Sequence, residues 1–294
     1  MRTYTTNQAL QTALSSMRRS DKRIAFVPTM GNLHDGHLQL VRRARELADV
    51  VVVSIFVNPL QFGANEDLEA YPRTLMADKE ALFAEGVQVL FTPEAEEIYP
   101  EGMDRQTLVN VPDISETLCG ADRPGHFQGV ATVVSKLFNI VQPDVAVFGQ
   151  KDFQQLAIIR KMVADLCMPI EIVGVATARA ADGLALSSRN GYLDSAQRQL
   201  APTLHKTLTD TRDALACGYD NYADLAAHAN QTLVQAGFSP DYFALRDAST
   251  LRDIDASTEE IVIAAAARLG TTRLIDNLTF RIEQGTDYQL LAAL

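Results

Sequence analysis

Five short runs of Val, Ile and other apolar residues, each followed by an amphipathic stretch, set the strongest limit on how this chain can fold. The runs lie at residues 24–28, 50–57, 87–91, 144–148 and 170–175, and helical patterns follow at about 37–48, 73–85, 128–141 and 152–167. Near-continuous apolar strands that alternate with helices are typical of a parallel sheet covered on both faces. We therefore predict an α/β fold with a Rossmann-like, doubly wound parallel sheet.

The pattern changes after about residue 186. Two polar-amphipathic helical stretches and three strand-like runs follow, at residues 195–217 and 221–236 and at 242–246, 261–265 and 273–277. Helices that precede a group of strands are typical of an α+β arrangement. The sequence thus predicts two domains, 1–186 with the parallel sheet and 187–294 as a smaller C-terminal α+β domain.

Charge restricts the partners of the chain. With 26 Lys and Arg against 37 Asp and Glu, the net charge is −11. Such a balance argues against nucleic acid or an anionic membrane as a partner of the whole surface. Residues 1–45 and 120–190 are nevertheless net positive. A local site for an anionic ligand is therefore expected in those segments.

The cysteines and the N-terminus indicate the compartment. Cys119, Cys167 and Cys217 lack the spacing of a disulfide framework or a metal site, so we expect buried free thiols in a reducing compartment. The first residues lead into a polar helical pattern without a signal peptide, and no apolar run approaches the roughly 18 residues of a membrane span. We predict a cytoplasmic protein.

The first long strand leads into a loop suited to phosphate. It reads Pro28-Thr-Met-Gly-Asn-Leu-His-Asp-Gly-His37 and runs directly into a helical pattern. Two imidazoles beside glycines at a helix N-terminus can hold phosphate oxygens, because the backbone N–H groups and the helix dipole both favour anions. His34 and His37 could instead only cap the turn or bind metal. No carboxylate or Cys ligand sits at matching spacing, so no metal site is predicted.

Further polar residues follow other strands and meet the same sheet edge, where open parallel sheets bind ligands. Asn58 and Gln61 come after the second strand, and Lys151 and Asp152 open the helix that carries Gln155. A cation at that position can follow charge developing on phosphate oxygens. The alternatives are an Asn-Pro turn with an exposed Gln61, and a Lys151 that is simply solvated.

Six ordered motifs between residues 28 and 190 resemble those of the pantothenate synthetase family. Besides residues 28–37 they are Phe56-Val-Asn-Pro-x-Gln-Phe62, Tyr71-Pro-Arg73, Arg123-Pro-Gly-His-Phe-x-Gly-Val130, Phe148-Gly-x-Lys-Asp-x-Gln-Gln155 and Asp182-Gly-Leu-Ala-x-Ser-Ser-Arg-Asn190. His34-Asp-Gly-His37 also resembles the HxGH signature of a wider nucleotidyltransferase superfamily. The resemblance implies that ATP drives condensation of (R)-pantoate with β-alanine through pantoyl adenylate, releasing AMP and pyrophosphate.

The resemblance also implies roles for residues. His34, His37 and Lys151 would be catalytic, and ATP would be bound by Met30, Gly31, Asn32, Leu33, His34, Asp35, Gly36, His37, Gly149, Gln150, Lys151, Asp152, Ala178, Leu186, Ser187, Ser188 and Arg189. The small substrates would meet Asn58, Gln61, Arg123, Val133, Val134 and Gln155. Mg²⁺ would arrive on ATP, the C-terminal domain would act as a lid, and the protein would be a homodimer.

Some assignments stay open on sequence grounds. Ser187-Ser-Arg-Asn190 also fits an ordinary surface turn. His126 is as well explained by a structural as by a functional role, while His205 and His228 lie on polar helical stretches and are expected to be solvated. Two rival functions share the first loop: another HxGH adenylyltransferase, and a catalytically silent nucleotide-binding module.

Overall fold

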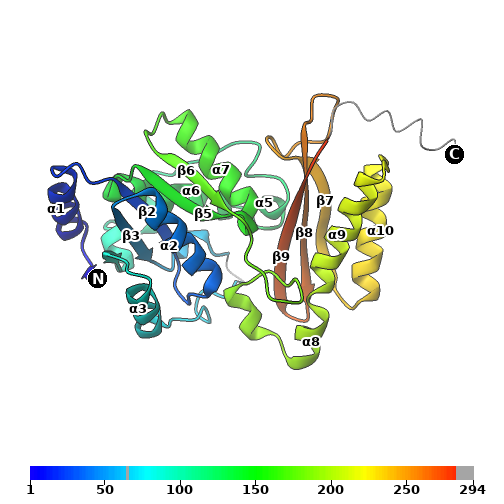
Figure 1. The fold of residues 1–294 in the computed structure, drawn as a ribbon, viewed down its shortest axis with the longest axis horizontal. Coiled ribbons are helices and arrows are strands. Elements are labelled where there is room, and N and C mark those ends of the chain that lie inside the picture. The colour runs from blue at the N-terminus through cyan, green and yellow to red at the C-terminus, as the bar shows by residue number, and fades with distance from the viewer. Residues whose placement is uncertain (64–65, 283–294) are drawn as a thin grey trace. The chain divides into compact units, whose positions relative to one another are not determined.

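The computed structural model describes residues 1–63 and 66–282. Over these residues the chain forms two compact units, one within residues 1–178 and 186–188 and the other from 179–185 and from residue 189 onwards (Figure 1). The chain therefore passes between the units three times within the segment 178–189. The predicted boundary after residue 186 falls inside this segment, and the end of the predicted second domain, residues 283–294, lies outside the described residues.

The first unit contains the predicted parallel sheet. Its six strands are β1 (Arg2–Tyr4), β2 (Ile24–Thr29), β3 (Val50–Ile55), β4 (Val89–Phe91), β5 (Val145–Gly149) and β6 (Glu171–Val175), in the spatial order β1-β4-β3-β2-β5-β6. Every pairing between neighbours is parallel. The predicted α/β class is confirmed. Strand β1 was not predicted, because three residues are too few to show a pattern.

Alternating side chains of the strands explain why both faces are covered. Ala25 and Val27 pack with Leu40 and Val41 of α2 (Asp35–Leu47) in one buried cluster. Phe26, between them, points to the opposite face. There its ring packs edge-to-face against Phe138 of α6 (His126–Val141), with the ring centroids 6.4 Å apart. The other helices of this unit are α1 (Asn7–Arg18), α3 (Leu75–Ala84), α4 (Ala95–Ile98), α5 (Cys119–Asp122) and α7 (Phe153–Asp165).

The strand order brings three loops to one place. Strand β2 lies between β3 and β5. From β2 the chain continues to β3 on one side of the sheet, and only after β4 does it cross to β5 on the other side. The carboxyl ends of β2 and β5 therefore flank a switch point, which is where open α/β sheets bind ligands. The 3₁₀ turns η1 (Pro59–Gln61) and η3 (Gln150–Asp152) follow β3 and β5 at this edge.

The second unit is the predicted α+β arrangement. Strands β7 (Ser239–Asp247), β8 (Glu260–Leu269) and β9 (Thr272–Arg281) form an antiparallel sheet. Alternate residues of β8, Ile261 and Ile263, share a buried cluster with Leu204 and Leu208 of α9 (Thr203–Ala216) and with Leu233 of α10 (Tyr222–Gln235). Burial of one helix pair against one sheet face gives this unit its own core.

Two sequence-based expectations were wrong in detail. The helical stretch 195–217 is divided into α8 (Ser195–Leu200) and α9, because Pro202 lacks the N–H that would continue the first helix. Of the three free cysteines only Cys119 is buried, whereas Cys167 and Cys217 are exposed. Both exposed thiols lie where a helix ends, in turns at the surface.

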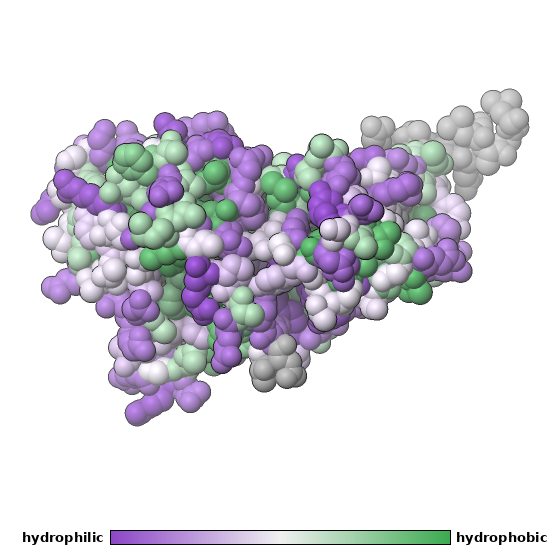
Figure 2. Space-filling model, turned by 90° about the horizontal axis from the view of Figure 1, so that it is seen from below, coloured by the Kyte–Doolittle hydropathy of each residue, from purple (hydrophilic) through white to green (hydrophobic). Residues whose placement is uncertain are grey.

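On the face that Figure 2 displays, hydrophilic residues are spread among smaller apolar areas. No helix within residues 1–63 and 66–282 is both long and apolar enough to cross a bilayer.

Candidate active site

The two histidines of the loop after β2 cap helix α2 with one ring nitrogen each. His34 Nδ1 accepts a hydrogen bond from the Gly36 N–H at 3.2 Å, and His37 Nδ1 accepts one from the His34 N–H at 3.3 Å. A neutral imidazole that accepts at Nδ1 carries its proton on Nε2. Capping and phosphate binding are therefore compatible, because the cap uses Nδ1 and leaves two Nε2–H donors.

Burial keeps both rings neutral. It lowers the pKa of His34 to about 4, with the positive charge of Lys151 adding to the effect. It lowers the pKa of His37 to about 3, where His34 and then Lys151 contribute further. The ring centroids lie 4.1 Å apart, so two imidazolium ions would repel each other strongly. At neutral pH the pair supplies hydrogen-bond donors rather than charge.

Glycine is required at two positions of this loop. A side chain on Gly36 would bring its Cβ within 2.9 Å of Cε1 in the His34 ring, closer than real Cβ contacts come. Gly31 has a φ of +81°, in the left-handed region that other residues avoid. The glycines therefore let the backbone turn sharply and let the His34 ring lie over the start of α2.

Asp78 holds the loop from α3 and was missed by the sequence analysis. Its carboxylate accepts the N–H groups of Asn32 at 3.0 Å and Leu33 at 2.8 Å, and the hydroxyl of Thr74 at 3.2 Å. The side chain is only 3% exposed. In the sequence its only signal is that it lies four residues before Leu82, on the same face of the helix as this other buried residue of α3. A carboxylate beneath the loop thus satisfies two backbone donors that would otherwise be unpaired.

Replacing Asp78 by alanine is expected to lower the free energy of unfolding by about 1–3 kcal/mol, because two partly buried N–H groups lose their acceptor. Asn, which keeps one oxygen, should cost less. Glu80 on the same helix is exposed, so Glu80→Ala is the control and should change stability by less than about 0.5 kcal/mol. Urea unfolding measures all three, and equal losses in Asp78→Ala and Glu80→Ala would contradict the proposed support of the loop.

Asn58 orients Gln61. Asn58 Nδ2 donates to the Gly129 carbonyl at 3.3 Å and to Gln61 Oε1 at 2.9 Å, while its Oδ1 accepts from Leu60 N–H and from the Tyr99 hydroxyl at 2.7 Å. All hydrogen-bonding positions of the Asn58 amide are thus used inside the protein, and the residue is 1% exposed. Gln61 consequently presents its Nε2 donors, which also contact Met30 Sδ at 3.3 Å.

The residues after β5 form the second part of this edge. Lys151 Nζ lies 3.5 Å from Asp152 Oδ2. The charge of Lys151 lowers the pKa values of His34 and His37, and the charge of Asp152 raises them. Gln154 is buried and bonds to the carbonyls of residues 114 and 117 and to the N–H of residue 119. Gln155, one position on, forms no side-chain hydrogen bond to any residue in the described part of the chain. Its amide therefore stays available to a ligand.

Val133 and Val134 lie on α6, each 5% exposed. Their contact with a small substrate stays a prediction. Arg123 differs from the expectation more clearly, because its guanidinium is already paired with both carboxylate oxygens of Glu66 at 2.6 Å. The pair uses two of the five N–H donors of the guanidinium and offsets its positive charge, so a ligand would meet a largely neutralised group.

Part of the 178–189 segment belongs to the first unit and lies beside the loop. The Ala178 Cβ is 3.4 Å from the position a Cβ would take on Gly36, and the Leu186 N–H donates to the Ala178 carbonyl. Ser188 Oγ donates to the Asn32 carbonyl at 3.1 Å. Two predicted ATP-binding positions, Ala178 and Ser188, are therefore adjacent to the loop, and a third, Leu186, is bonded to Ala178. Ser187 lies between the last two, and Arg189 belongs to the second unit.

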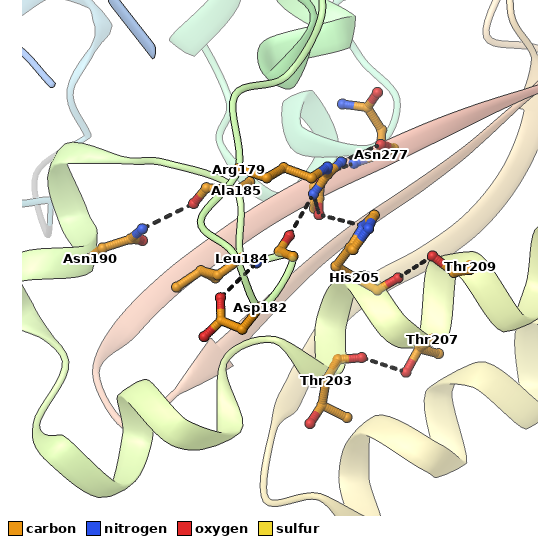
Figure 3. A network of polar contacts seen from close by, with 12 residues as sticks. Arg179, Asp182, Leu184, Ala185, Asn190, Thr203, His205, Thr207, Thr209 and Asn277 are labelled. Carbon is orange, nitrogen blue, oxygen red and sulfur yellow. Dashed lines mark hydrogen bonds and ion pairs between the residues drawn. The ribbon is translucent and has the colours of Figure 1, made fainter. Parts of the chain in front are cut away.

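Within the second unit, an ion pair fixes the hairpin 179–185 (Figure 3). Arg179 donates to both carboxylate oxygens of Asp276 at 2.6 and 2.9 Å, and to the Gly183 carbonyl at 3.1 Å. His205 Nδ1 lies 3.6 Å from Asp276. His205 is therefore partly buried beside a carboxylate, and the expectation that it is solvated was wrong. His228 is exposed, as predicted.

Comparison with known proteins decides the family. The family model described as "Pantoate-beta-alanine ligase" matches residues 2–279. The chain belongs to the pantoate-beta-alanine ligase family. The pantothenate synthetase of Pseudomonas aeruginosa PAO1 is 58% identical over 283 residues, which is 96% of this chain and all of that protein. The relative of the same name in Shewanella loihica is 59% identical over 94% of this chain and 99% of its own length.

Solved structures of the family agree with the fold. The enzyme of Thermus thermophilus superposes with a TM-score of 0.88 at 46% identity, over 95% of this chain and 99% of that one. The ligase of Francisella tularensis, crystallised with beta-gamma ATP and beta-alanine, gives a TM-score of 0.78 at 33% identity, over 95% of this chain and 97% of that one. Family membership and the two-part fold therefore rest on full-length likeness.

Proposed function

We propose that this protein condenses (R)-pantoate with β-alanine to pantothenate, using ATP and releasing AMP and pyrophosphate. The observation that carries the proposal is the contact between the phosphate loop and the side-chain amide of Gln61, in which Gln61 Nε2 lies 3.3 Å from Met30 Sδ. It joins a loop with two Nε2–H donors to an uncharged donor suited to a hydroxy acid. Membership of the family supports the same reaction.

The reaction would proceed in two steps. The pantoate carboxylate attacks the α-phosphorus of ATP and displaces pyrophosphate, giving pantoyl adenylate. The amine of β-alanine then attacks the acyl carbon of this mixed anhydride, and AMP leaves. No covalent bond to the protein is needed, so the side chains contribute positioning and electrostatic stabilisation.

Each part of the site has a role in this scheme. The Nε2–H groups of His34 and His37 would donate to phosphate oxygens and stabilise the pentacoordinate phosphorus. Lys151 would neutralise the departing pyrophosphate together with Ser187, Ser188 and Arg189. Gln61 and Gln155 would hold pantoate, with Asn58 fixing the amide of Gln61. Arg123 is left out of the substrate contacts, because Glu66 already neutralises it.

Mg²⁺ would enter on the triphosphate. No group of three or more His, Cys, Asp or Glu side chains in the described part of the chain could hold a metal ion. Asp78, the acidic residue under the loop, is engaged by backbone N–H groups. The phosphate oxygens and water would therefore supply most ligands of Mg²⁺. A homodimer, a cytoplasmic location and a lid role for the second unit remain predictions.

Omission of single substrates tests the function. ATP with pantoate alone should release pyrophosphate up to about one equivalent per site, because the adenylate stays bound. Addition of β-alanine should release AMP continuously, and ATP with β-alanine alone should yield neither product. Absence of AMP with both substrates present would overturn the proposal. Adenylyl transfer to a phosphate acceptor instead would favour the rival HxGH adenylyltransferase.

A further inference from the structure

His126, the first residue of α6, touches the main chain of Gln61. Its Nδ1 lies 2.7 Å from the Gln61 carbonyl oxygen, and its Nε2 lies 3.0 Å from an Nη atom of Arg123. A carbonyl only accepts and a guanidinium only donates. The proton of the neutral ring must therefore sit on Nδ1, while Nε2 accepts from Arg123. This is the opposite tautomer from that of His34 and His37.

The neighbours of His126 hold it in this state. Burial lowers the pKa of His126 to about 4, and the charge of Arg123 acts in the same direction, against smaller opposing effects of the Gln61 carbonyl, Glu66 and Asp152. Glu66 pairs with the Nε and one Nη of Arg123, which aims the other Nη at His126. The ion pair thus orients the donor that selects the tautomer.

Helix α6 also holds the turn η1 by close packing. A Cβ on Gly129 would come within 2.4 Å of the Leu60 carbonyl oxygen, so the helix backbone lies directly against the turn. The Gly129 carbonyl accepts from Asn58, which in turn orients the amide of Gln61. The first turn of α6 therefore constrains Gln61 twice, through its main-chain carbonyl and through its side chain.

We propose that His126 is a positioning residue for the small-acid substrate: its Nδ1–H, selected by the Arg123–Glu66 pair, holds the Gln61 carbonyl and thereby directs the Gln61 amide. The proposal rests on the proposed function, because it takes Gln61 as a substrate contact. It gives Arg123 a role through His126 rather than on a ligand. His126 itself touches no reacting atom and is not a catalytic residue.

Two amide substitutions separate the ring nitrogens. In His126→Asn the side-chain amide nitrogen lies near the former Nδ1 and can donate to the Gln61 carbonyl. In His126→Gln the amide reaches the former Nε2, so this donor is lost, as it is in His126→Ala. The Asn variant should keep the KM for pantoate within about threefold of wild type, whereas Gln and Ala should raise it about tenfold, the scale of one lost hydrogen bond.

The KM for ATP provides the contrast. The His126 ring bonds to Gln61 and Arg123, which lie outside residues 28–37, so this constant should stay within about threefold in all three variants. A purely structural histidine would instead change both constants together and would not be rescued by Asn. Nitrogen NMR of the wild-type ring should show the Nδ1–H form, and Arg123→Met should shift that signal.

Gln61→Ala distinguishes failure of this inference from failure of the proposed function. This variant should raise the KM for pantoate at least as much as His126→Ala. If it does but the Asn, Gln and Ala variants at residue 126 behave alike, His126 does not position Gln61, and the proposed function stands. If Gln61→Ala leaves the KM for pantoate unchanged, Gln61 is no substrate contact and both proposals about this residue are wrong.

Discussion

Replacing His37 by alanine is expected to slow formation of pantoyl adenylate about a hundredfold or more. The substitution removes one of two Nε2–H donors at the phosphate loop, and loss of a preorganised donor to developing negative charge costs on the order of 3 kcal/mol in the transition state. Single-turnover release of pyrophosphate from ATP and pantoate measures this step without interference from β-alanine.

Two further variants separate catalysis from capping. Asn at position 37 places an acceptor near the former Nδ1, so it should keep the bond from the His34 N–H but lack the Nε2 donor. Gln reaches the former Nε2 and should keep the donor but lose the cap. His37→Asn should therefore be stable and slow, and His37→Gln less stable by about 1 kcal/mol but faster. An adenylation rate for His37→Ala within about threefold of wild type would contradict the catalytic role.

The protonation state of the pair can be measured directly. Because burial lowers the pKa values of His34 and His37 to about 4 and about 3, neither ring should titrate between pH 8 and pH 6 in the free protein. Nitrogen NMR should show both in the Nε2–H form throughout this range.

Removal of the Asp276 carboxylate is expected to give the largest loss of stability. Asp276→Ala leaves the partly buried Arg179 guanidinium without its bidentate carboxylate partner. Removing one member of a buried pair lowers the free energy of unfolding by about 3–5 kcal/mol. Asp210→Ala breaks a pair with Lys206 in which both side chains are more than half exposed, and it should cost less than about 1 kcal/mol. Urea unfolding measures both, and equal effects would show that Asp276 does not anchor the hairpin 179–185.

The same carboxylate predicts a pH dependence. Burial alone would raise the pKa of Asp276, but its contacts with His205 and Arg179 hold it below the ordinary value. The unfolded chain therefore binds a proton here at a higher pH than the folded chain does. The stabilisation is present above about pH 4, the unfolded pKa of Asp, and is lost as pH falls through the folded pKa. The Asp276→Ala variant should lack this component of the acid transition.

Much of the candidate site could be predicted because it follows strand ends. Gly31, His34 and His37 come directly after β2, and Lys151 follows β5, so the sheet edge alone places them near each other. Residues that act from elsewhere gave little signal. Asp78 lies within helix α3, between Ala77 and Lys79, and nothing in its neighbourhood along the chain shows that it meets the N–H groups of Asn32 and Leu33.

The sequence by itself determined the α/β class, the alternation of strands β2 to β6 with helices, and the motifs of the family, because these depend on local periodicity and on residue types at short spacing. Only the tertiary structure decided how the side chains share their hydrogen bonds. It assigned Nδ1 of His34 to a cap, paired Arg123 with Glu66 and used every position of the Asn58 amide. These pairings depend on which groups from distant segments lie within hydrogen-bond distance of one another in the folded protein, and spacing along the chain does not contain that information.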